Sequence, residues 1–355
     1  MYRHILVTGG AGFVGCALAL ALKRSDFGAR VTAFDNLRRR GSELNLRRLR
    51  EAEIGFVHGD VRSPGDLESL REPPDLIVEC SAEPSAQAGY GGSPEYLIHT
   101  NLLGCFHCLE LARRHRADFL LLSSSRVYPY GAINKLAYVE EETRYSLCGD
   151  QPVAGASEHG ISERFPLEGA RSLYGMTKLA AELMVEEYAD AYGLRTIINR
   201  CGLLTGPGQM AKSDQGVLGL WVAAHYFGRP LEYIGFHGTG KQVRDFLHVA
   251  DLADLILAQL SNWDTWRGRT VNIGGGPSQS LSLVECTGWC RRITGRSIPI
   301  SPNPQDRPAD VRIYISDTRQ AQALTEWRPL RNAERTLGEI FEWIRSEEEA
   351  LRGVL

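Results

Sequence analysis

The stretch that most constrains the fold is a glycine-rich turn close to the amino terminus. An apolar run, Tyr2–Thr8, leads into the sequence GGAGFVG at positions 9–15, and a second apolar run over residues 16–22 follows at once. The first run is typical of a buried parallel strand. Gly9, Gly12 and Gly15, placed between a strand and a helix, allow a tight turn, backbone contact with a pyrophosphate and close packing of the helix. An ordinary glycine-rich turn has the same composition, so the motif needs support from elsewhere in the chain.

A carboxylate at the end of the next apolar run gives that support. Asp35 lies twenty residues after Gly15 and directly follows the run Val31–Phe34. A carboxylate at this place in a dinucleotide-binding fold binds the adenosine ribose 2′-hydroxyl, and it would repel a 2′-phosphate. The pattern therefore predicts NAD in preference to NADP. Three arginines at positions 38–40 weaken the preference slightly, although a solvated basic turn explains them as well.

Strand-like and helix-like runs alternate through about residue 200. The later strands are expected at Glu53–Val57, Leu76–Cys80, Phe119–Ser123 and Arg195–Asn199. This alternation predicts an α/β protein with a Rossmann-like, doubly wound parallel sheet. After residue 200 the pattern loosens, as expected of a smaller α/β substrate-binding lobe, and the chain is long enough for both. We expect residues 1–200 and about 243–273 in the NAD-binding domain, and residues 201–242 and 274–355 in the lobe.

A tyrosine and a lysine point to the chemistry. Tyr174 and Lys178 are four residues apart in a helical stretch, so they share one face of the helix. An ammonium beside a phenol favours the phenolate, and such a pair suits proton transfer next to a redox cofactor. The spacing alone is weak support, because most such pairs simply line a helix.

The glycine turn, the acidic strand end and Tyr-x-x-x-Lys, in this order, resemble the extended short-chain dehydrogenase/reductase family, specifically its NAD-dependent nucleotide-sugar epimerases and dehydratases. The resemblance covers nearly the whole chain, and residues 35–46 and 241–245 look most like the CDP-paratose (CDP-tyvelose) 2-epimerases. It implies a homodimer in which helices near residues 102–113 and 174–192 form a four-helix bundle. It also implies that NAD is bound by Gly9, Gly12, Phe13, Val14, Asp35, Asn36, Asp60, Val61, Asn101, Tyr174 and Lys178.

The same resemblance implies catalytic and substrate-binding residues. Ser124, at the end of an apolar strand, would bind the sugar oxygen. Tyr174 would take the hydroxyl proton, and Lys178 would hold the nicotinamide ribose. The expected substrate-binding residues are Ser125, Arg126, Arg244 and Arg307, of which the last two would grip a diphosphate with their planar guanidinium groups.

The residues after Ser124 bear on the reaction. Dehydratases of the family carry an Asp-Glu pair there, because loss of water needs an acid. Here the positions hold Ser125 and Arg126, so we expect an epimerase that works through a transient keto intermediate, with a CDP-sugar 2-epimerase as the first choice. A UDP- or GDP-sugar 4-epimerase is the nearest alternative, and a dehydratase or decarboxylase is less favoured. A non-catalytic NAD sensor is the alternative from a different class.

Residues 129–170 depart from the family pattern, because they roughly double the usual separation between the serine and the tyrosine. The stretch is polar and weakly periodic, so it is either a surface loop or a lid over the sugar site. The lid is favoured because both ends of the stretch emerge beside expected catalytic residues.

Composition excludes several classes of partner. The net charge of −3 gives no sign of nucleic-acid binding. No apolar run approaches the ~20 residues that span a bilayer, and no signal peptide precedes the first strand, so we expect a cytoplasmic protein without a membrane partner.

Eight cysteines include Cys105 and Cys108, but no second ligand pair has zinc-like spacing. Buried thiols without a metal are expected.

Overall fold

The computed structural model describes residues 2–212 and 214–355, and the chain divides into two compact units. Unit 1 comprises Met1–Ser124, Leu173–Arg200 and Leu252–Val271, whereas unit 2 comprises Ser125–Ser172, Cys201–Asp251 and Asn272–Leu355. Each unit therefore takes its residues from several separate stretches of the chain.

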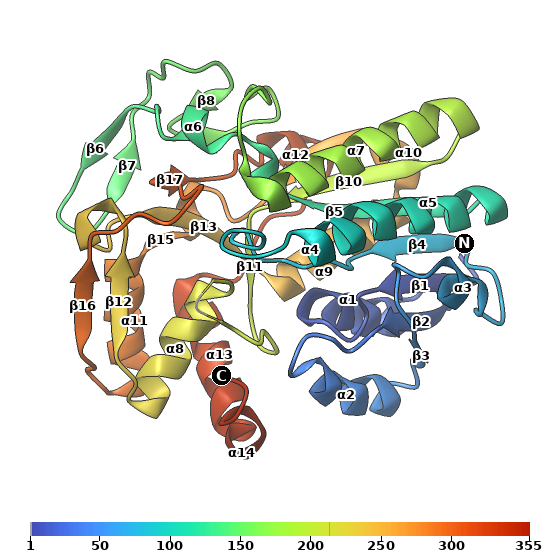
Figure 1. Cartoon of the computed structure of the whole chain (residues 1–355), viewed down its shortest axis with the longest axis horizontal. Coiled ribbons are helices and arrows are strands. Elements are labelled where there is room, and N and C mark those ends of the chain that lie inside the picture. Colours follow the sequence, from blue (N-terminus) through green and yellow to red (C-terminus); the bar gives the residue numbers. More distant parts are fainter. Residues whose placement is uncertain (1, 213) are drawn as a thin grey trace. The chain divides into compact units, whose positions relative to one another are not determined.

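Unit 1 is built around a seven-stranded sheet with the order β14-β10-β5-β4-β1-β2-β3 (Figure 1). Strands β3, β2, β1, β4 and β5 pair in parallel. The strands are β1 His4–Thr8, β2 Arg30–Asp35, β3 Gly55–His58, β4 Leu76–Glu79, β5 Asp118–Ser124, β10 Thr196–Cys201 and β14 Arg269–Ile273. The Rossmann-like, doubly wound sheet predicted from the sequence is confirmed.

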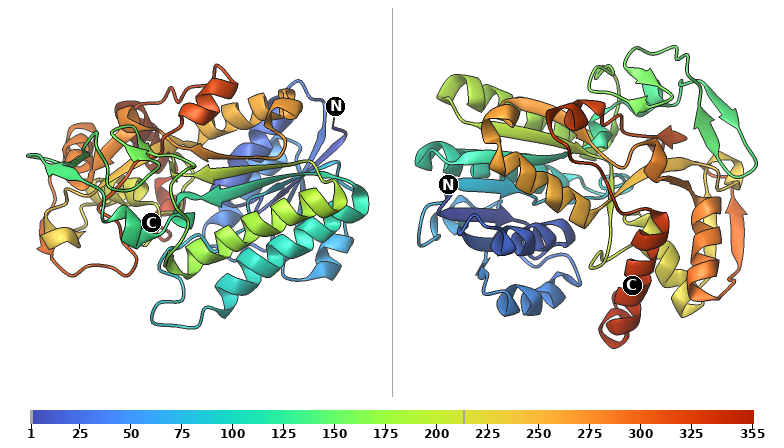
Figure 2. Two further views of the ribbon diagram at one scale, coloured as in Figure 1. Left: turned by 90° about the horizontal axis from the view of Figure 1, so that it is seen from above. Right: turned by 180° about the vertical axis from the view of Figure 1, so that it is seen from behind.

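Helices cover both faces of this sheet, as Figure 2 shows. On one face, α3 (Pro64–Glu68), α5 (Gly104–His115) and α7 (Ser172–Tyr192) share one apolar core with the strands. On the other face lie α1 (Phe13–Arg24) and α9 (Val249–Ser261). The shorter elements are η1 Ser42–Leu44, α2 Asn45–Glu51, α4 Glu95–Ile98, the π-helical turn η2 His99–Leu103 and α10 Trp263–Trp266.

Unit 2 contains a smaller sheet with strand β13 (Val243–His248) at its centre. β13 pairs in parallel with β11 (Leu203–Thr205) and β17 (Ile313–Tyr314), and antiparallel with β15 (Ser280–Ser282). Beside it, β12 (Leu231–Ile234) and β16 (Ile300–Asn303) form a parallel pair. The other elements are η3 Ser125–Val127, α6 Tyr130–Ile133, α8 Val217–Phe227, η4 Phe236–Gly238, η5 Pro277–Gln279, α11 Leu283–Thr294, α12 Arg319–Leu324, α13 Ala333–Ser346 and α14 Glu348–Leu351.

Three helices of unit 2, namely α8, α11 and α13, pack against one another. Local residues determine both ends of α11. At its start the Ser282 hydroxyl accepts a hydrogen bond from the Glu285 N–H (3.0 Å), and the Glu285 carboxylate accepts one from the Ser282 N–H (2.9 Å). This reciprocal capping satisfies two backbone donors that the helix itself cannot. At the other end Gly295 adopts φ +67°, a left-handed conformation that ends a helix without strain.

The inserted stretch 129–170 folds as two hairpins and belongs to unit 2. One hairpin joins β6 (Tyr138–Glu140) to β7 (Tyr145–Leu147), and the other joins β8 (Ala156–Ser157) to β9 (Gly160–Ile161). The Tyr145 N–H donates to the Lys241 carbonyl (3.1 Å), and the Asn272 side chain donates to the Ile161 carbonyl (2.8 Å). The bond to Lys241 and a further bond from the Ile161 N–H to the Ile315 carbonyl (2.8 Å) join the stretch to residues next to β13 and β17 of the smaller sheet, whereas Asn272 lies in β14.

The unit boundaries therefore differ from those predicted. Residues 129–170 and about 243–273 were expected in the NAD-binding domain, but residues 125–172, 243–251 and 272–273 belong to unit 2. The reason is physical: β13 is the central strand of the small sheet, and the insertion bonds to Lys241 before β13 and to Ile315 after β17. Sequence periodicity identifies a strand but does not show which sheet the strand joins.

Candidate active site

The glycine turn of unit 1 depends on missing side chains. Gly9 adopts φ +60°, and a Cβ there would lie 2.9 Å from the Cys80 carbonyl carbon. A Cβ on Gly15 would lie 2.1 Å from the Gly9 carbonyl oxygen, so no larger residue fits without moving backbone. Phe13 and Val14 form the start of α1, whose first N–H groups have no intrahelical partner. This end of the helix suits a phosphate group.

Asp35 ends β2 beside this turn, as predicted. Its carboxylate accepts hydrogen bonds from the Ala11 N–H (3.1 Å) and the Leu37 N–H (2.8 Å). Burial raises the pKa of Asp35, although the backbone N–H groups that it binds oppose this. The backbone N–H groups of Ala11, Gly12 and Leu37 all act on this carboxylate, and a carboxylate has about four acceptor positions, so one position is left for a ribose hydroxyl group.

Asn36 and Asp60 lie together next to Asp35. The Asn36 side chain donates to the Asp60 carboxylate (2.8 Å), and Arg62 donates to the same carboxylate (2.7 Å). Burial alone would raise the pKa of Asp60, but the hydrogen bonds from Arg62 and Asn36 outweigh it and lower the pKa to about 2. Asp60 is therefore ionised at neutral pH.

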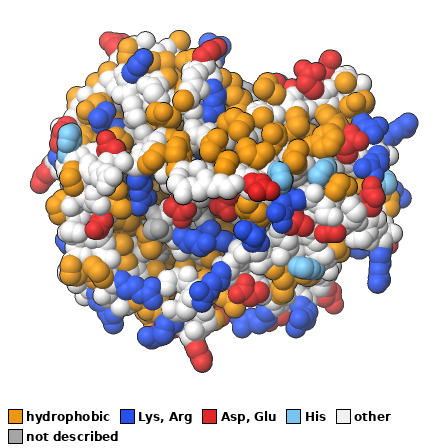
Figure 3. All heavy atoms as spheres, in the orientation of Figure 1, with side chains coloured by type: hydrophobic (Ala, Val, Ile, Leu, Met, Phe, Trp, Pro, Cys, Tyr) orange, Lys and Arg blue, Asp and Glu red, His pale blue; other side chains and the backbone are white. Residues whose placement is uncertain are grey.

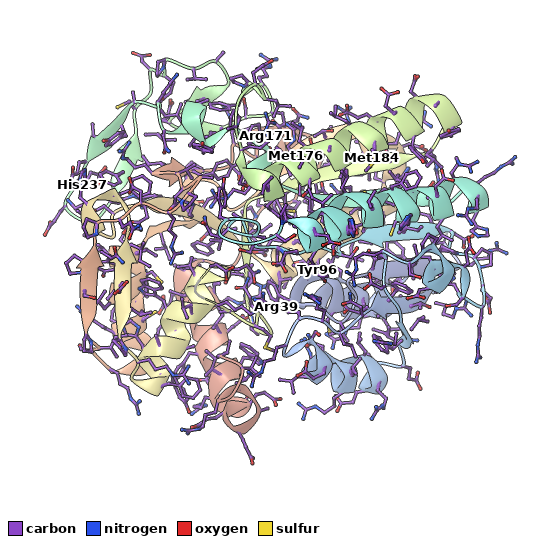
Figure 4. All side chains as sticks on the ribbon, viewed as in Figure 1. Arg39, Tyr96, Arg171, Met176, Met184 and His237 are labelled. Carbon is purple, nitrogen blue, oxygen red and sulfur yellow. The ribbon has the colours of Figure 1, made fainter. Side chains whose placement is uncertain are left out.

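Tyr96, labelled in Figure 4, is stacked against two guanidinium groups of unit 1. The Arg38 guanidinium lies 3.9 Å from the centre of the Tyr96 ring, and the Arg62 guanidinium lies 4.8 Å from it. Contacts of this kind are cation–π interactions. Arg38 is thus stacked on an aromatic ring that it shares with Arg62.

Two further predicted NAD-binding residues are Val61, which follows Asp60, and Asn101, which lies in η2. Val61 is buried, and its side chain fills the space that a Cβ on Gly104 would need. The Asn101 amide accepts from the Glu83 N–H (2.7 Å) and donates to the Glu83 carbonyl (3.1 Å) and the Thr177 hydroxyl (3.2 Å). Asn101 therefore fixes the loop after β4 against α7, one residue from Lys178.

The three predicted catalytic residues all lie in unit 1 and are almost fully buried. Ser124 is the last residue of β5, whereas Tyr174 and Lys178 lie in the first two turns of α7. The Lys178 ammonium donates to the Leu122 carbonyl (2.9 Å), which joins α7 to β5 two residues before Ser124. Burial alone would lower the pKa of Lys178, but the Glu79 carboxylate and Tyr174 outweigh it and raise the pKa. Lys178 is therefore protonated at neutral pH.

Glu79, which was not among the predicted site residues, lies beside Lys178. Its carboxylate oxygen Oε2 is 4.0 Å from the Lys178 ammonium, and both side chains are buried. The only available signal was an acidic residue at the end of the otherwise apolar run 76–79. A second buried carboxylate, Glu182 on α7, forms a two-pronged ion pair with Arg200 and accepts from the Ser123 hydroxyl (2.5 Å). Arg200 therefore has a structural partner.

The predicted substrate-binding arginines lie in unit 2 around the loop 307–312. Arg244, on β13, donates to the Asp310 carboxylate (2.8 Å) and to the Val243 carbonyl (2.8 Å). Arg126, in η3, donates to the Ala309 carbonyl (3.1 Å). Burial lowers the pKa of Arg244 to about 10; the Asp310 carboxylate opposes this and the nearby Arg126 adds to it. The loop thus gathers Arg126, Arg244 and its own Arg307.

Comparison with known proteins places this geometry in a family. The profile of the family described as "NAD dependent epimerase/dehydratase family" matches residues 5–274. The CDP-paratose 2-epimerase of Salmonella typhi is 31% identical over 348 residues, which cover 96% of this chain and 99% of that protein. The chain belongs to the NAD dependent epimerase/dehydratase family. The dTDP-glucose 4,6-dehydratase of Mycolicibacterium smegmatis is 26% identical, over 97% of this chain and 94% of that one.

Solved structures agree with the fold. The UDP-glucose 4-epimerase of Thermus thermophilus, solved in complex with NAD, superposes with a TM-score of 0.76 at 23% identity, over 97% of this chain and 99% of that one. Family membership makes this protein an NAD-dependent enzyme. The residues present fit that cofactor, because Gly9 and Gly15 have no Cβ in the turn at the start of α1 and the Asp35 carboxylate lies beside that turn. Gly9, Gly12, Phe13 and Val14 would hold its pyrophosphate, and Asp35 its adenosine ribose.

Three further findings concern membrane-spanning helices, disulfides and metal sites. No helix of the described chain combines the length and the apolar character that crossing a membrane requires. Within residues 2–212 and 214–355, no disulfide joins the eight cysteines, and no three side chains of His, Cys, Asp or Glu are grouped so that they could hold a metal ion.

Replacing Gly15 with alanine tests the role of the Gly9–Gly15 turn in folding and in binding NAD. The added Cβ would meet the Gly9 carbonyl oxygen at 2.1 Å, so we expect a loss of at least about 2 kcal/mol in the free energy of unfolding and loss of NAD from the purified protein. Gly65→Ala is the matched control, because nothing lies within 4 Å of a Cβ there. Denaturant titration and NAD content would be measured for both. A Gly15→Ala variant with native stability and native NAD content would contradict the assignment.

Proposed function

We propose that this enzyme is an epimerase of nucleotide-activated sugars that works through a transient keto intermediate, and that its substrate is a CDP-linked sugar epimerised at C2. One observation carries the proposal. The Lys178 ammonium donates to the Leu122 carbonyl, and this bond holds the start of α7, which carries Tyr174, against the end of β5, which carries Ser124. The 31% identity to a CDP-paratose 2-epimerase supports the nucleotide and the carbon.

NAD, when bound, supplies a reversible acceptor for the hydride of a sugar carbon. Tyr174, as the general base, takes the proton from the hydroxyl group on that carbon, so that the O–H and C–H bonds break together and a C=O bond forms. The Lys178 ammonium stabilises negative charge on the oxygens of the site during the transfer, and the Ser124 hydroxyl donates a hydrogen bond to the sugar oxygen. Inversion of the carbon would need the keto sugar to present its opposite face to the cofactor, and Tyr174 would give the proton back to the sugar oxygen.

The residues after Ser124 support epimerisation over dehydration. Loss of water from a sugar needs an acid beside the leaving hydroxyl. Ser125 and Arg126 hold these positions in η3, and neither side chain is an acid at neutral pH. A 4-epimerase is the second candidate, because the "Putative UDP-glucose 4-epimerase" of Methanocaldococcus jannaschii is 28% identical over 96% of this chain.

The arginines of unit 2 support binding of a diphosphate. Arg126 and Arg244 bond to the loop 307–312, and Arg307 lies within it. The positive charge of Arg126 helps to lower the pKa of Arg244, so the two guanidinium groups repel each other and an anion between them would be stabilised. Guanidinium groups bind two phosphate oxygens at once, which suits a nucleoside diphosphate.

An apolar surface on unit 1 supports a homodimer. Large apolar side chains are exposed along η2, α5 and α7, namely Leu103, Phe106, Met176, Leu183 and Tyr192. Figure 3 shows apolar side chains gathered over these helices, and Figure 4 labels Met176 on α7. Monomeric proteins rarely expose large contiguous apolar patches. We propose that α5 and α7 meet the same helices of a second copy, as the family resemblance implies.

Tyr174→Phe removes the proposed proton acceptor and keeps the ring. We expect turnover of the nucleotide sugar to fall by about 10²- to 10⁴-fold, the usual contribution of a positioned acid–base group, while NAD stays bound. Tyr192→Phe, an exposed position at the end of the same helix, is the control and should leave turnover unchanged. Activity that survives in Tyr174→Phe would remove the proton-transfer assignment.

Nucleotide preference tests the substrate class. In thermal-shift measurements we expect CDP to stabilise the protein more than UDP, GDP or dTDP. Arg307→Ala is expected to weaken binding of all four by about tenfold to a hundredfold, because it removes a charge-assisted bond to phosphate. Arg345→Ala, an exposed position on α13, is the control. A clear preference for UDP or GDP would favour the 4-epimerase, and indifference to Arg307→Ala would remove that residue from the site.

Sedimentation analysis tests the dimer. The wild-type protein should sediment as a dimer at micromolar concentration, and Leu183→Glu should shift it to a monomer, because a charge would be buried in an apolar contact. Leu330→Glu is the matched control: Leu330 is 75% exposed but lies in unit 2, so the dimer should persist. A monomeric wild-type protein would show the proposal to be wrong.

A further inference from the structure

Glu79 is an acidic residue deep in unit 1. It is the last residue of β4, which lies between β1 and β5 in the sheet. Its side chain is 1% exposed, and that of Lys178 is 4% exposed. A carboxylate rarely occupies such a position unless it has a charged or hydrogen-bonding partner.

Hydrogen bonds fix one oxygen of this carboxylate. Oε1 accepts from the Ser81 N–H (3.1 Å), from the Ser81 hydroxyl and from the Thr8 hydroxyl (3.4 Å). Thr8 also accepts from the Cys80 N–H (3.2 Å), and it directly precedes the glycine turn. The side chain therefore cannot turn away from its place, because three donors converge on Oε1.

The other oxygen faces the lysine. Oε2 is 4.0 Å from the Lys178 ammonium and has no hydrogen-bond partner among the described residues. A proton on Oε2 would be left without an acceptor, whereas a negative charge there has an ammonium beside it. The geometry therefore favours the ionised carboxylate paired with the protonated lysine.

The remaining groups around the pair are neutral or are part of the proposed chemistry. Tyr174, Cys80 and Cys105 also face Lys178, and Cys105 and Cys108 face Glu79. Burial raises the pKa of the Cys105 and Cys108 thiols, so these groups carry no charge at neutral pH. Within the described structure, Glu79 is thus the carboxylate that balances the buried ammonium.

We propose that Glu79 is a positioning residue: its carboxylate keeps the Lys178 ammonium charged and holds it beside Tyr174. The proposal rests on the proposed proton transfer for its meaning in catalysis. A buried ammonium without a counter-ion tends to lose its proton. A neutral amine at Lys178 would no longer stabilise negative charge in the site during proton transfer, so Glu79 acts on the reaction through the lysine and without touching the substrate.

The direct test is a titration of Lys178 that needs no substrate. Protein labelled with ¹³C at the lysine ε-carbon would be titrated by NMR, and the signal of Lys178 would be assigned from its loss in Lys178→Met. In Glu79→Gln we expect the pKa of Lys178 to fall by about one to three units, the usual effect of removing an opposite charge at this range. An unchanged pKa would overturn the proposal.

Glu182→Gln is the matched control, because Glu182 is also a fully buried carboxylate of unit 1 but pairs with Arg200. The pKa of Lys178 should not change in this variant. An equal fall in both variants would mean that any lost buried carboxylate disturbs the lysine, and would overturn the specific pairing.

The reciprocal measurement covers the case in which Glu79→Gln does not fold. Coupling between two titrating groups is mutual, so Lys178→Met should raise the pKa of the Glu79 carboxyl by a similar amount. This would be followed in protein labelled at the glutamate δ-carbon, with Glu79 assigned from its loss in Glu79→Asp. A carboxyl pKa that does not respond to Lys178→Met would overturn the proposal.

The pH profile of turnover links the pair to catalysis. The raised pKa of Lys178 keeps the ammonium protonated towards alkaline pH, and loss of the Glu79 charge lowers that pKa. The alkaline limb of kcat should therefore move to lower pH in Glu79→Gln, and Glu79→Asp should restore part of the shift. A uniform loss of kcat at every pH would show a merely structural role. Because the NMR titration needs no substrate, it stays decisive even if the proposed reaction is wrong.

Discussion

The approach of Gly15 to the Gly9 carbonyl is the constraint on which the rest of unit 1 depends. The helix α1 can follow β1 so closely only because no Cβ stands at that point, where it would lie 2.1 Å from a carbonyl oxygen. The close turn also brings Ala11 next to Asp35. The register of β1 against β4 places Thr8 opposite Glu79, so the strand that leads into the turn also contacts the carboxylate beside Lys178.

The parts of the structure that the sequence predicts well are those governed by local rules. The strands β1, β2, β3, β4, β5 and β10 of the large sheet begin and end within two residues of the predicted positions, since a buried parallel strand needs a continuous apolar run. Tyr174 and Lys178 lie on one helix as their spacing requires, and Asp35 ends β2 beside the glycine turn. Each of these features is set by residues close together in the chain.

The parts that the sequence does not predict depend on contacts between distant segments. Nothing in the letters around Glu79 shows that it meets Lys178, which is 99 residues further along and on another element. The insertion joins unit 2 through bonds to Lys241 and Asn272. Strand β13 belongs to the small sheet because it pairs with β15 and β17. Periodicity describes which face of an element is apolar, but it does not identify the partner of that face.

Because the chain passes several times between the two units, the two sheets can be completed only late in translation. Strands β1 to β5 can pair as soon as residue 124 has left the ribosome, but β10 and the edge strand β14 arrive only with residues 196–201 and 269–273. The central strand of unit 2 waits for β17 at Ile313–Tyr314. A nascent chain therefore carries an unfinished sheet, with an open strand edge, through most of its translation, and a truncated message would release a fragment with that edge uncovered.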